Sequence, residues 1–207
     1  MKKIAVLVSG RGSNLQTIID NIESGSIKGK IEVVISSKKD AYALERAKKH
    51  NIDGVYIGKS NFPDIDERND KIIQILNEKE INLIILAGYM NILNEKIVQL
   101  YRNKIINIHP SLIPSFCGRG FYGQRVHKAV IDYGVKLTGA TVHFVDEGAD
   151  TGPVILQKVV EVDFDDTVET LAKKVLKIEH ELLPLGVKFF CEDRLKVYGR
   201  RVKIEDK

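Results

Sequence analysis

Five apolar segments separated by helical patterns dominate the first half of this 207-residue chain. The apolar segments, rich in Ile, Val and Leu, cover residues 3–9, 31–36, 54–57, 83–87 and 104–108. Between them, apolar residues recur at helical spacing over residues 14–23, 41–50, 68–79 and 95–101. Near-continuous apolar strands that alternate with helices are typical of a parallel sheet covered by helices on both faces. The pattern therefore predicts an α/β fold with a mostly parallel, twisted sheet.

The pattern changes after Pro110. Residues 110–124 contain two prolines and three glycines and have no clear period. A connection of this length in a compact domain is usually functional or mobile. Beyond it, the sequence predicts one more helix and two strands that pair antiparallel, over residues 125–133, 137–145 and 154–162.

The last part of the chain predicts a helix followed by a small hairpin. Thr167 has the character of a helix N-cap, with Thr170 in place of the Glu or Gln of a capping box. Pro184 is expected to kink or end that helix. The hairpin is expected over residues 195–204, so that the whole chain, residues 1–207, forms a single domain with a small terminal hairpin near residues 194–204.

Composition points to a cytoplasmic protein that acts on small molecules. The net charge is +4, and the basic residues are scattered. Only the tail from Arg194 to Lys203 is locally basic, which is weak evidence for a nucleic-acid partner, whereas a modest positive balance suits an enzyme with anionic substrates. The first residues lack the pattern of a signal peptide, and no apolar run approaches the roughly 18 residues that span a membrane. Cys117 and Cys191 have no metal-ligand spacing and are expected to be free thiols.

Asn107 and His109 lie in the segment KIINIHPSLIP, two residues apart on the predicted strand 104–108. At this spacing both side chains leave the same face of the strand, and Pro110 ends the strand directly after them. The carboxyl end of a strand is where ligand crevices form in an open α/β sheet. The alternative is a strand end whose two polar side chains bond only to nearby backbone.

Gly12, Ser13 and Asn14 lie at the turn between the first strand and the first helix. Glycine at such a turn lets backbone N–H groups approach a phosphate. The third glycine of a dinucleotide fingerprint would fall at Leu15 and the P-loop lysine is absent, so a single phosphate fits better than a dinucleotide. A tight turn with Ser13 or Asn14 as N-cap explains the same residues.

Asp150 and His143 are the remaining polar residues of interest. Asp150 is a partner that could orient and charge the imidazole of His109, although a turn residue ahead of Thr151 would look the same. His143 alternates with apolar neighbours on a predicted strand and is equally compatible with an edge residue satisfied by its surroundings. A zinc site from His109, His143 and Asp150 is conceivable, but no local metal-ligand spacing supports it, so no metal is expected.

Nearly the whole chain resembles the folate-dependent phosphoribosylglycinamide formyltransferase family of purine biosynthesis. The resemblance lies in the segments SGRGSNLQTIID, LAGYMNIL, KIINIHPSLIP, TGATVHFVDEGADTGPVILQ and IEHELLP. The Asn-x-His-Pro-Ser-Leu segment is shared with other enzymes that use 10-formyltetrahydrofolate, whereas the GSN loop is more specific to this family. The resemblance implies a Rossmann-like formyltransferase fold with antiparallel C-terminal additions.

The resemblance also implies an activity and its residues. The family transfers the formyl group of 10-formyltetrahydrofolate, a co-substrate, to the amine of glycinamide ribonucleotide, without a metal, and a homodimer is possible. The implied catalytic residues are Asn107, His109 and Asp150. The implied binding residues are Gly12, Ser13 and Asn14 for the substrate phosphate, Glu179 for the glycinamide amine, and Met90, Asn91, Ile92 and Leu93 for the folate pterin.

Three departures from the family pattern concern the folate side and the long loop. Ile65 stands at the spacing where relatives commonly carry an arginine, with Arg68 nearby, and Asn91 replaces a frequent arginine. The segment CGRGFYG is longer than in many relatives.

Two other functions compete with formyl transfer. A formyltetrahydrofolate hydrolase shares the KIINIH segment but usually has an N-terminal regulatory domain, whereas Met1 here directly precedes the first strand. A non-catalytic ribonucleotide-binding module explains GRGSN but leaves Asn107, His109 and Asp150 without a shared role. A methionyl-tRNA formyltransferase would need a further C-terminal domain.

Overall fold

The computed structural model of the chain describes residues 1–206 and divides into two compact units. Unit 1 comprises residues 1–106 and unit 2 begins at residue 107, so the boundary falls within strand β5 (Ile105–His109). The single domain predicted from chain length stays a prediction. In the described part of the chain, no helix is both long and apolar enough to cross a membrane.

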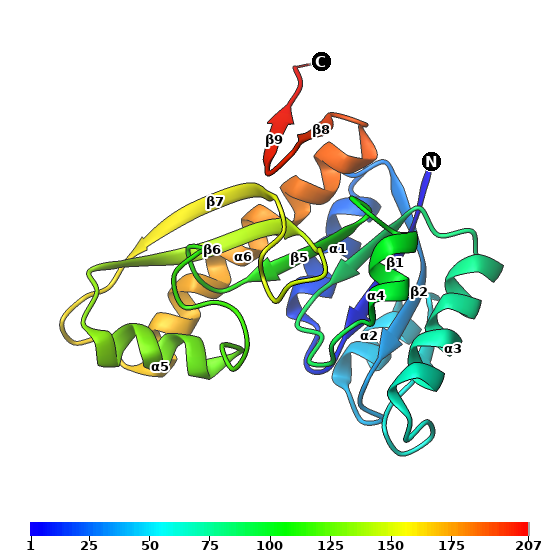
Figure 1. The fold of residues 1–207 in the computed structure, drawn as a ribbon, viewed down its shortest axis with the longest axis horizontal. Helices are drawn as coiled ribbons and strands as arrows, with labels where there is room; N and C mark the ends of the chain where they lie inside the picture. Colours follow the sequence, from blue (N-terminus) through cyan, green and yellow to red (C-terminus); the bar gives the residue numbers. More distant parts are fainter. Residues whose placement is uncertain (207) are drawn as a thin grey trace. The chain divides into compact units, whose positions relative to one another are not determined.

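Unit 1 is a parallel sheet with helices between its strands (Figure 1). Its strand order is β3-β2-β1-β4 and then the first residues of β5. The strands are β1 (Lys2–Val8), β2 (Gly29–Ser36), β3 (Asp53–Tyr56) and β4 (Leu83–Leu86), and the helices are α1 (Ser13–Glu23), α2 (Tyr42–Lys49), α3 (Ile65–Glu78) and α4 (Glu95–Leu100). The apolar run of β1 is fully buried from Ile4 to Val8, which explains why it lacks the polar alternation of a half-exposed strand.

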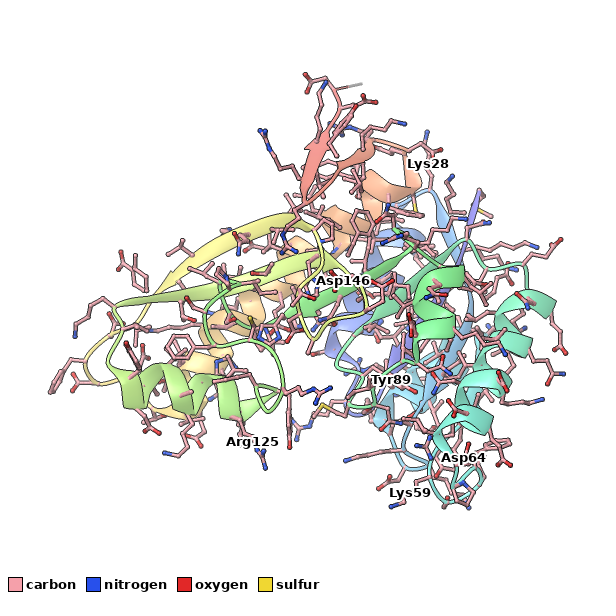
Figure 2. All side chains as sticks on the ribbon, in the orientation of Figure 1. Lys28, Lys59, Asp64, Tyr89, Arg125 and Asp146 are labelled. Atoms are coloured by element: carbon pink, nitrogen blue, oxygen red, sulfur yellow. The ribbon has the colours of Figure 1, made fainter. Side chains whose placement is uncertain are left out.

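Helix α3 begins at Ile65, three residues before the start predicted at Arg68. The reason is Asp64, whose carboxylate accepts hydrogen bonds from the backbone N–H groups of Asp66 at 2.8 Å and Glu67 at 3.0 Å. These same bonds hold the pKa of the Asp64 carboxyl below its usual value. Asp64 lies at the start of the helix in Figure 2, where a negative charge also suits the helix dipole.

Unit 2 contains the end of β5 and the antiparallel strands expected from the sequence. Its strand order is β5-β6-β7-β9-β8, with β6 antiparallel to β7 and β8 antiparallel to β9. The elements are α5 (Gln124–Tyr133), β6 (Leu137–Phe144), β7 (Val154–Glu161), α6 (Val168–Cys191), β8 (Leu195–Tyr198) and β9 (Arg201–Ile204). The predicted fold class, a mostly parallel α/β sheet with antiparallel C-terminal additions, is confirmed.

Helix α6 packs against β6 and β7 and continues through Pro184 (Figure 1). The expectation that Pro184 could end the helix is wrong. A proline inside a helix costs about 3 kcal/mol, whereas each fully buried leucine or valine stabilises by about 1.5–3 kcal/mol. Leu182, Leu183 and Val187 on either side of the proline are buried, which offsets that cost. The predicted Thr167 cap is confirmed, since Thr167 and Thr170 form a reciprocal capping box.

Candidate active site

Asn107, His109, His143 and Asp150 come together in unit 2. The Asp150 carboxylate faces both imidazoles, with Oδ2 3.5 Å from His109 Nδ1 and Oδ1 3.7 Å from His143 Nε2. The Asn107 Nδ2 atom lies 3.1 Å from His143 Nε2. The structure therefore places the three predicted catalytic residues in one cluster and adds His143, for which the sequence left a satisfied edge residue equally open.

Two strand ends bring the histidines into this cluster. His109 is the last residue of β5 and is 4% exposed, and Pro110 follows it. His143 is the second-last residue of β6 and is 1% exposed. The pairing of β6 with β7 shifts between Val142 and His143, and such an irregularity re-aims a side chain near the end of a strand.

Asp150 belongs to a loop that is held from several sides. Its φ of 57° is left-handed, a conformation that costs free energy for a residue with a side chain and that is concentrated at functional sites. The backbone N–H of Gly118 donates to Asp150 Oδ2 at 2.9 Å. The Arg200 guanidinium, on the hairpin β8–β9, donates to the carbonyl of Thr151 at 2.8 Å. Asp150 is therefore a turn residue in its backbone conformation. Its carboxylate also contacts Gly118, His109 and His143, which a turn alone would not require.

His109 has an oxygen at each ring nitrogen. Its Nε2 lies 3.0 Å from the carbonyl of Phe116, and its Nδ1 faces Asp150. A carbonyl only accepts hydrogen bonds, and so does a carboxylate. Both ring nitrogens of His109 therefore face groups that accept hydrogen bonds. In this conformation the segment that follows β5 covers His109.

His143 has the opposite surroundings, with a carbonyl at one nitrogen and an amide nitrogen at the other. Its Nδ1 lies 2.8 Å from the carbonyl of Phe144. Burial lowers the pKa of His143, and this outweighs the nearby negative charge of Asp150. The structure therefore presents His143 as a neutral imidazole.

His127 is a further buried imidazole that the sequence did not single out. It lies on α5 and is 6% exposed. Within residues 1–206 its Nδ1 has no hydrogen-bond partner. Burial lowers the pKa of His127, and the charge of nearby His109 adds to the shift.

The predicted phosphate loop lies in unit 1 and is built from backbone. Gly12 has a φ of 70° and precedes α1 as its N-cap, and within the described residues no side-chain cap bond is made there. The alternative that Ser13 or Asn14 serves as N-cap is therefore wrong. The N-cap residue of α1 thus caps none of the backbone N–H groups of the first turn with a side chain. A helix N-terminus of this kind favours an anion.

The neighbouring helix α2 fixes the shape of this loop. A Cβ at Gly12 would lie 2.7 Å from the Cβ of Ala43, which is too close for any other residue. The Ala43 N–H donates to the Gly10 carbonyl at 3.2 Å, and Arg46 Nε donates to the Arg11 carbonyl at 2.9 Å. The loop is thus held in one conformation by contacts within unit 1.

The predicted folate-binding residues follow β4 in unit 1. Met90 and Ile92 are exposed, whereas Leu93 is buried. The Met90 N–H donates to Ser9 Oγ at 2.8 Å, so the backbone of this segment is held. The other predicted substrate residue, Glu179, is half-buried on α6 in unit 2.

Arg68, near the position where relatives commonly carry an arginine, is hydrogen-bonded to its own loop. Its Nη1 donates to the carbonyls of Phe62 at 2.7 Å and Pro63 at 2.9 Å, which braces the loop before α3. Ile65, at the usual spacing, is exposed and apolar.

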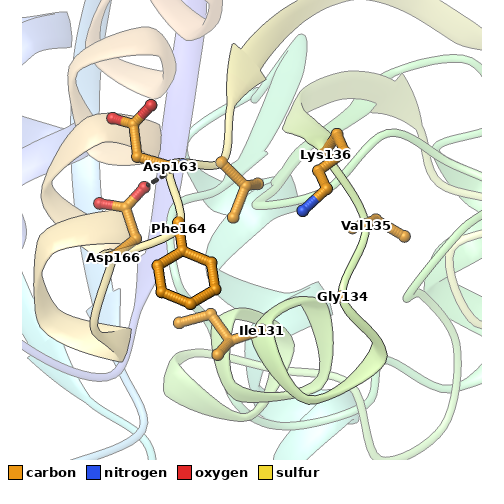
Figure 3. Close-up of a pocket in the computed structure, with 8 residues that line it drawn as sticks. Ile131, Gly134, Val135, Lys136, Asp163, Phe164 and Asp166 are labelled. Carbon is orange, nitrogen blue, oxygen red and sulfur yellow. Dashed lines mark hydrogen bonds between the residues drawn. The ribbon is translucent and has the colours of Figure 1, made fainter.

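Within residues 1–206, no group of three or more His, Cys, Asp or Glu side chains is placed to hold a metal ion. A cavity of about 200 Å³ between the end of α5 and the loop after β7 is drawn in Figure 3. Its lining residues are Ile131, Gly134, Val135, Lys136, Val162, Asp163, Phe164 and Asp166. None of these is a predicted site residue.

Known formyltransferases match this chain over most or all of its length. A family profile described as formyl transferase matches residues 2–187. Phosphoribosylglycinamide formyltransferase from Haemophilus influenzae is 43% identical over 207 residues, covering 100% of this chain and 95% of that protein.

Solved structures match as well. Glycinamide ribonucleotide transformylase 1 from Symbiobacterium toebii aligns with a TM-score of 0.94 at 40% identity, covering 100% of this chain and 95% of that one. A formyltetrahydrofolate deformylase from Pseudomonas syringae aligns with a TM-score of 0.91 at 27% identity, covering 99% of this chain and 66% of that one.

Proposed function

This chain belongs to the formyl transferase family, and we propose that it transfers the formyl group of 10-formyltetrahydrofolate to the amine of glycinamide ribonucleotide in de novo purine biosynthesis. The observation that carries the proposal is the cluster of Asn107, His109 and Asp150 at the end of β5. The similarity to phosphoribosylglycinamide formyltransferase over the full chain supports the choice of the acceptor.

The reaction forms one bond and breaks another. The co-substrate supplies a formyl carbon; the acceptor amine forms a C–N bond to it, and the bond from that carbon to N10 of the folate breaks. One proton leaves the amine nitrogen and one is taken up at N10, so no oxidant or reductant is needed. The residues of the chain must therefore stabilise negative charge on the formyl oxygen and carry a proton.

Each residue of the cluster fits one of these tasks. The Asn107 amide and the His109 imidazolium are the donors for the formyl oxygen, and such preorganised donors are worth about 10²–10³ in rate each. Asp150, whose carboxylate faces His109 Nδ1, balances the imidazolium charge and accepts the amine proton directly or through water.

The segment that covers His109 has to move for this chemistry. His109 Nε2 is bonded to the Phe116 carbonyl, so it reaches the formyl oxygen only after that bond opens. The Phe116 ring contacts Phe121 and Tyr133 edge-on, with ring centroids 6.3 and 5.9 Å apart, and these contacts hold the covered conformation. We propose that substrate binding replaces the Phe116 carbonyl at His109.

The binding roles that we propose are those that the family resemblance implies. Gly12, Ser13 and Asn14 hold the phosphate of the ribonucleotide through backbone N–H groups at the start of α1. Glu179 binds the glycinamide amine. The pterin of the folate lies against Met90, Asn91, Ile92 and Leu93. We further propose a cytoplasmic homodimer, which light scattering and cell fractionation test.

The decisive experiment measures formyl release from 10-formyltetrahydrofolate with and without glycinamide ribonucleotide. We expect release to depend on the ribonucleotide and formylglycinamide ribonucleotide to accumulate in equal amount. Hydrolysis is the second candidate because the deformylase fold is so similar. Equal release in both assays, with free formate as product, would establish hydrolysis instead.

A further inference from the structure

His143 lies between a backbone carbonyl and the amide of Asn107. Its Nδ1 is 2.8 Å from the Phe144 carbonyl, and its Nε2 is 3.1 Å from Asn107 Nδ2. The side chain is fully enclosed, whereas Asn107 is half-buried. If the Phe144 carbonyl or the Asn107 amide turned away, a buried nitrogen of His143 would lose its hydrogen bond, which costs free energy.

The chemistry of these three groups determines which way each hydrogen bond runs. The Phe144 carbonyl can only accept, so Nδ1 must carry the imidazole hydrogen. In a neutral imidazole Nε2 then has a lone pair and needs a donor. The nitrogen of the Asn107 amide can donate to Nε2, whereas its oxygen cannot. The Phe144 carbonyl thus fixes the hydrogen of His143 on Nδ1, and the lone pair left on Nε2 fixes the orientation of the Asn107 amide.

A charged His143 would reverse that orientation. An imidazolium has a hydrogen at Nε2 and would require the oxygen of Asn107 instead of its nitrogen. The charged groups that face His143 are Asp150, Asp146 and His109. Burial nevertheless lowers the pKa of His143, and Asp150 Oδ1 at 3.7 Å is beyond hydrogen-bond distance.

We propose that His143 is a positioning residue that holds the Asn107 amide with its nitrogen fixed as the donor toward the reacting oxygen. One amide hydrogen is used at His143 Nε2, and the second is then aimed by the geometry of the planar amide. Without an acceptor at Nε2, the amide can turn over and present its oxygen, which repels a developing negative charge. The proposal rests on the proposed role of Asn107 in formyl transfer. The first test of it is independent of that role, because it measures only the hydrogen position on His143.

The first test measures the tautomer of His143 in the substrate-free wild-type protein. Long-range proton–nitrogen NMR on the full chain with nitrogen-15-labelled histidine, at neutral pH, distinguishes Nδ1–H, Nε2–H and the imidazolium. The signals are assigned by comparison with His143→Gln. We expect a neutral ring with the hydrogen on Nδ1; an Nε2–H tautomer or an imidazolium overturns the proposal, whatever reaction the enzyme catalyses.

The second test uses two polar variants that differ in the bond they keep. In His143→Gln the side-chain oxygen reaches the place of Nε2 and can accept from Asn107. In His143→Asn the shorter amide reaches the Phe144 carbonyl but not Asn107. We expect His143→Gln to keep turnover within about tenfold, and His143→Asn to lose roughly 10–10²-fold in kcat with little change in KM, below the loss for a missing donor itself.

A double-mutant cycle separates positioning from general damage to the fold. In an Asn107→Leu background, His143→Asn should lower kcat by no more than about twofold further, because its effect acts through Asn107. If the two losses multiply, or if Gln and Asn at position 143 lose turnover equally, His143 supports only the fold. Should the tautomer be Nδ1–H while no formyl reaches glycinamide ribonucleotide, the proposed function fails and the same cycle is run on formyl hydrolysis.

Discussion

The phosphate loop of unit 1 and the polar cluster of unit 2 are built in different ways. The loop at residues 10–14 is contiguous in sequence, and its shape comes from backbone dihedrals and the close approach of Ala43. The cluster is assembled from β5, β6 and the loop around Asp150, and it depends on side-chain hydrogen bonds in a buried place. A loop of this kind should be sensitive to added volume, whereas the cluster should be sensitive to charge and to the direction of hydrogen bonds.

The largest expected effect comes from removing the imidazole of His109. His109→Ala should lose roughly 10²–10⁴ in kcat, the usual worth of an acid–base or charge-stabilising group, with little change in either KM. Steady-state kinetics with both substrates measure this. The matched control is His50→Gln, which removes a histidine bonded to Glu23 in unit 1 and should keep normal turnover. Wild-type turnover in a folded His109→Ala protein would remove His109 from the mechanism.

The second prediction tests the charge of Asp150 separately from its backbone. Asn tolerates the left-handed conformation that Asp150 adopts, so Asp150→Asn keeps the turn and removes the negative charge. We expect kcat to fall by about 10²-fold, as measured by steady-state kinetics. The midpoint of thermal unfolding, measured on the same variant, should hardly change. Near-normal turnover would mean that Asp150 serves only the turn.

The third prediction concerns volume in the phosphate loop. Gly12→Ala places a Cβ 2.7 Å from that of Ala43 and also strains a φ of 70°. The strain of about 1–2 kcal/mol should raise KM for glycinamide ribonucleotide about tenfold while leaving KM for the folate unchanged.

Gly10→Ala is the matched control for Gly12→Ala. Among the described residues nothing lies within 4 Å of a Cβ placed at Gly10, so this variant should behave like the wild type. If both variants raise KM equally, or if the folate KM rises as well, the loop does not hold the phosphate.

The smallest expected effect is a pH dependence of stability that belongs to unit 2. Burial lowers the pKa of folded His127 below the unfolded value of 6.5, so the unfolded state binds more protons as the pH falls through that value. Stability should therefore decrease from about pH 7 downward until the folded pKa is passed.

His127→Leu should make the midpoint of urea unfolding less dependent on pH between about 7 and 5.5. Part of the dependence should remain, because the pKa of His143 is lowered in the same direction. Gly12→Ala should leave the slope unchanged, since the loop is made of backbone. A slope that does not change in His127→Leu would show that His127 is not buried as a neutral group.

Local sequence patterns predicted most helices and strands, and they predicted the placement of two site residues, Asn107 and His109. The apolar runs predicted the strands, the Thr167 and Thr170 pair predicted a helix start, and the spacing of Asn107 and His109 predicted a shared face at a strand end. The early start of α3 was also locally encoded, since Asp64 precedes the first turn as a cap residue, but the helical period alone did not show it.

The partners of His143 and the conformation of Asp150 were decided by tertiary structure. Strand period places His143 on a face, but the Asn107 amide reaches its ring through the adjacency of β5 and β6. Helix starts and strand faces depend on interactions between residues a few positions apart, which a sequence displays directly. Hydrogen bonds across 36 positions depend on which strands pair and in which register, and no local pattern records that choice.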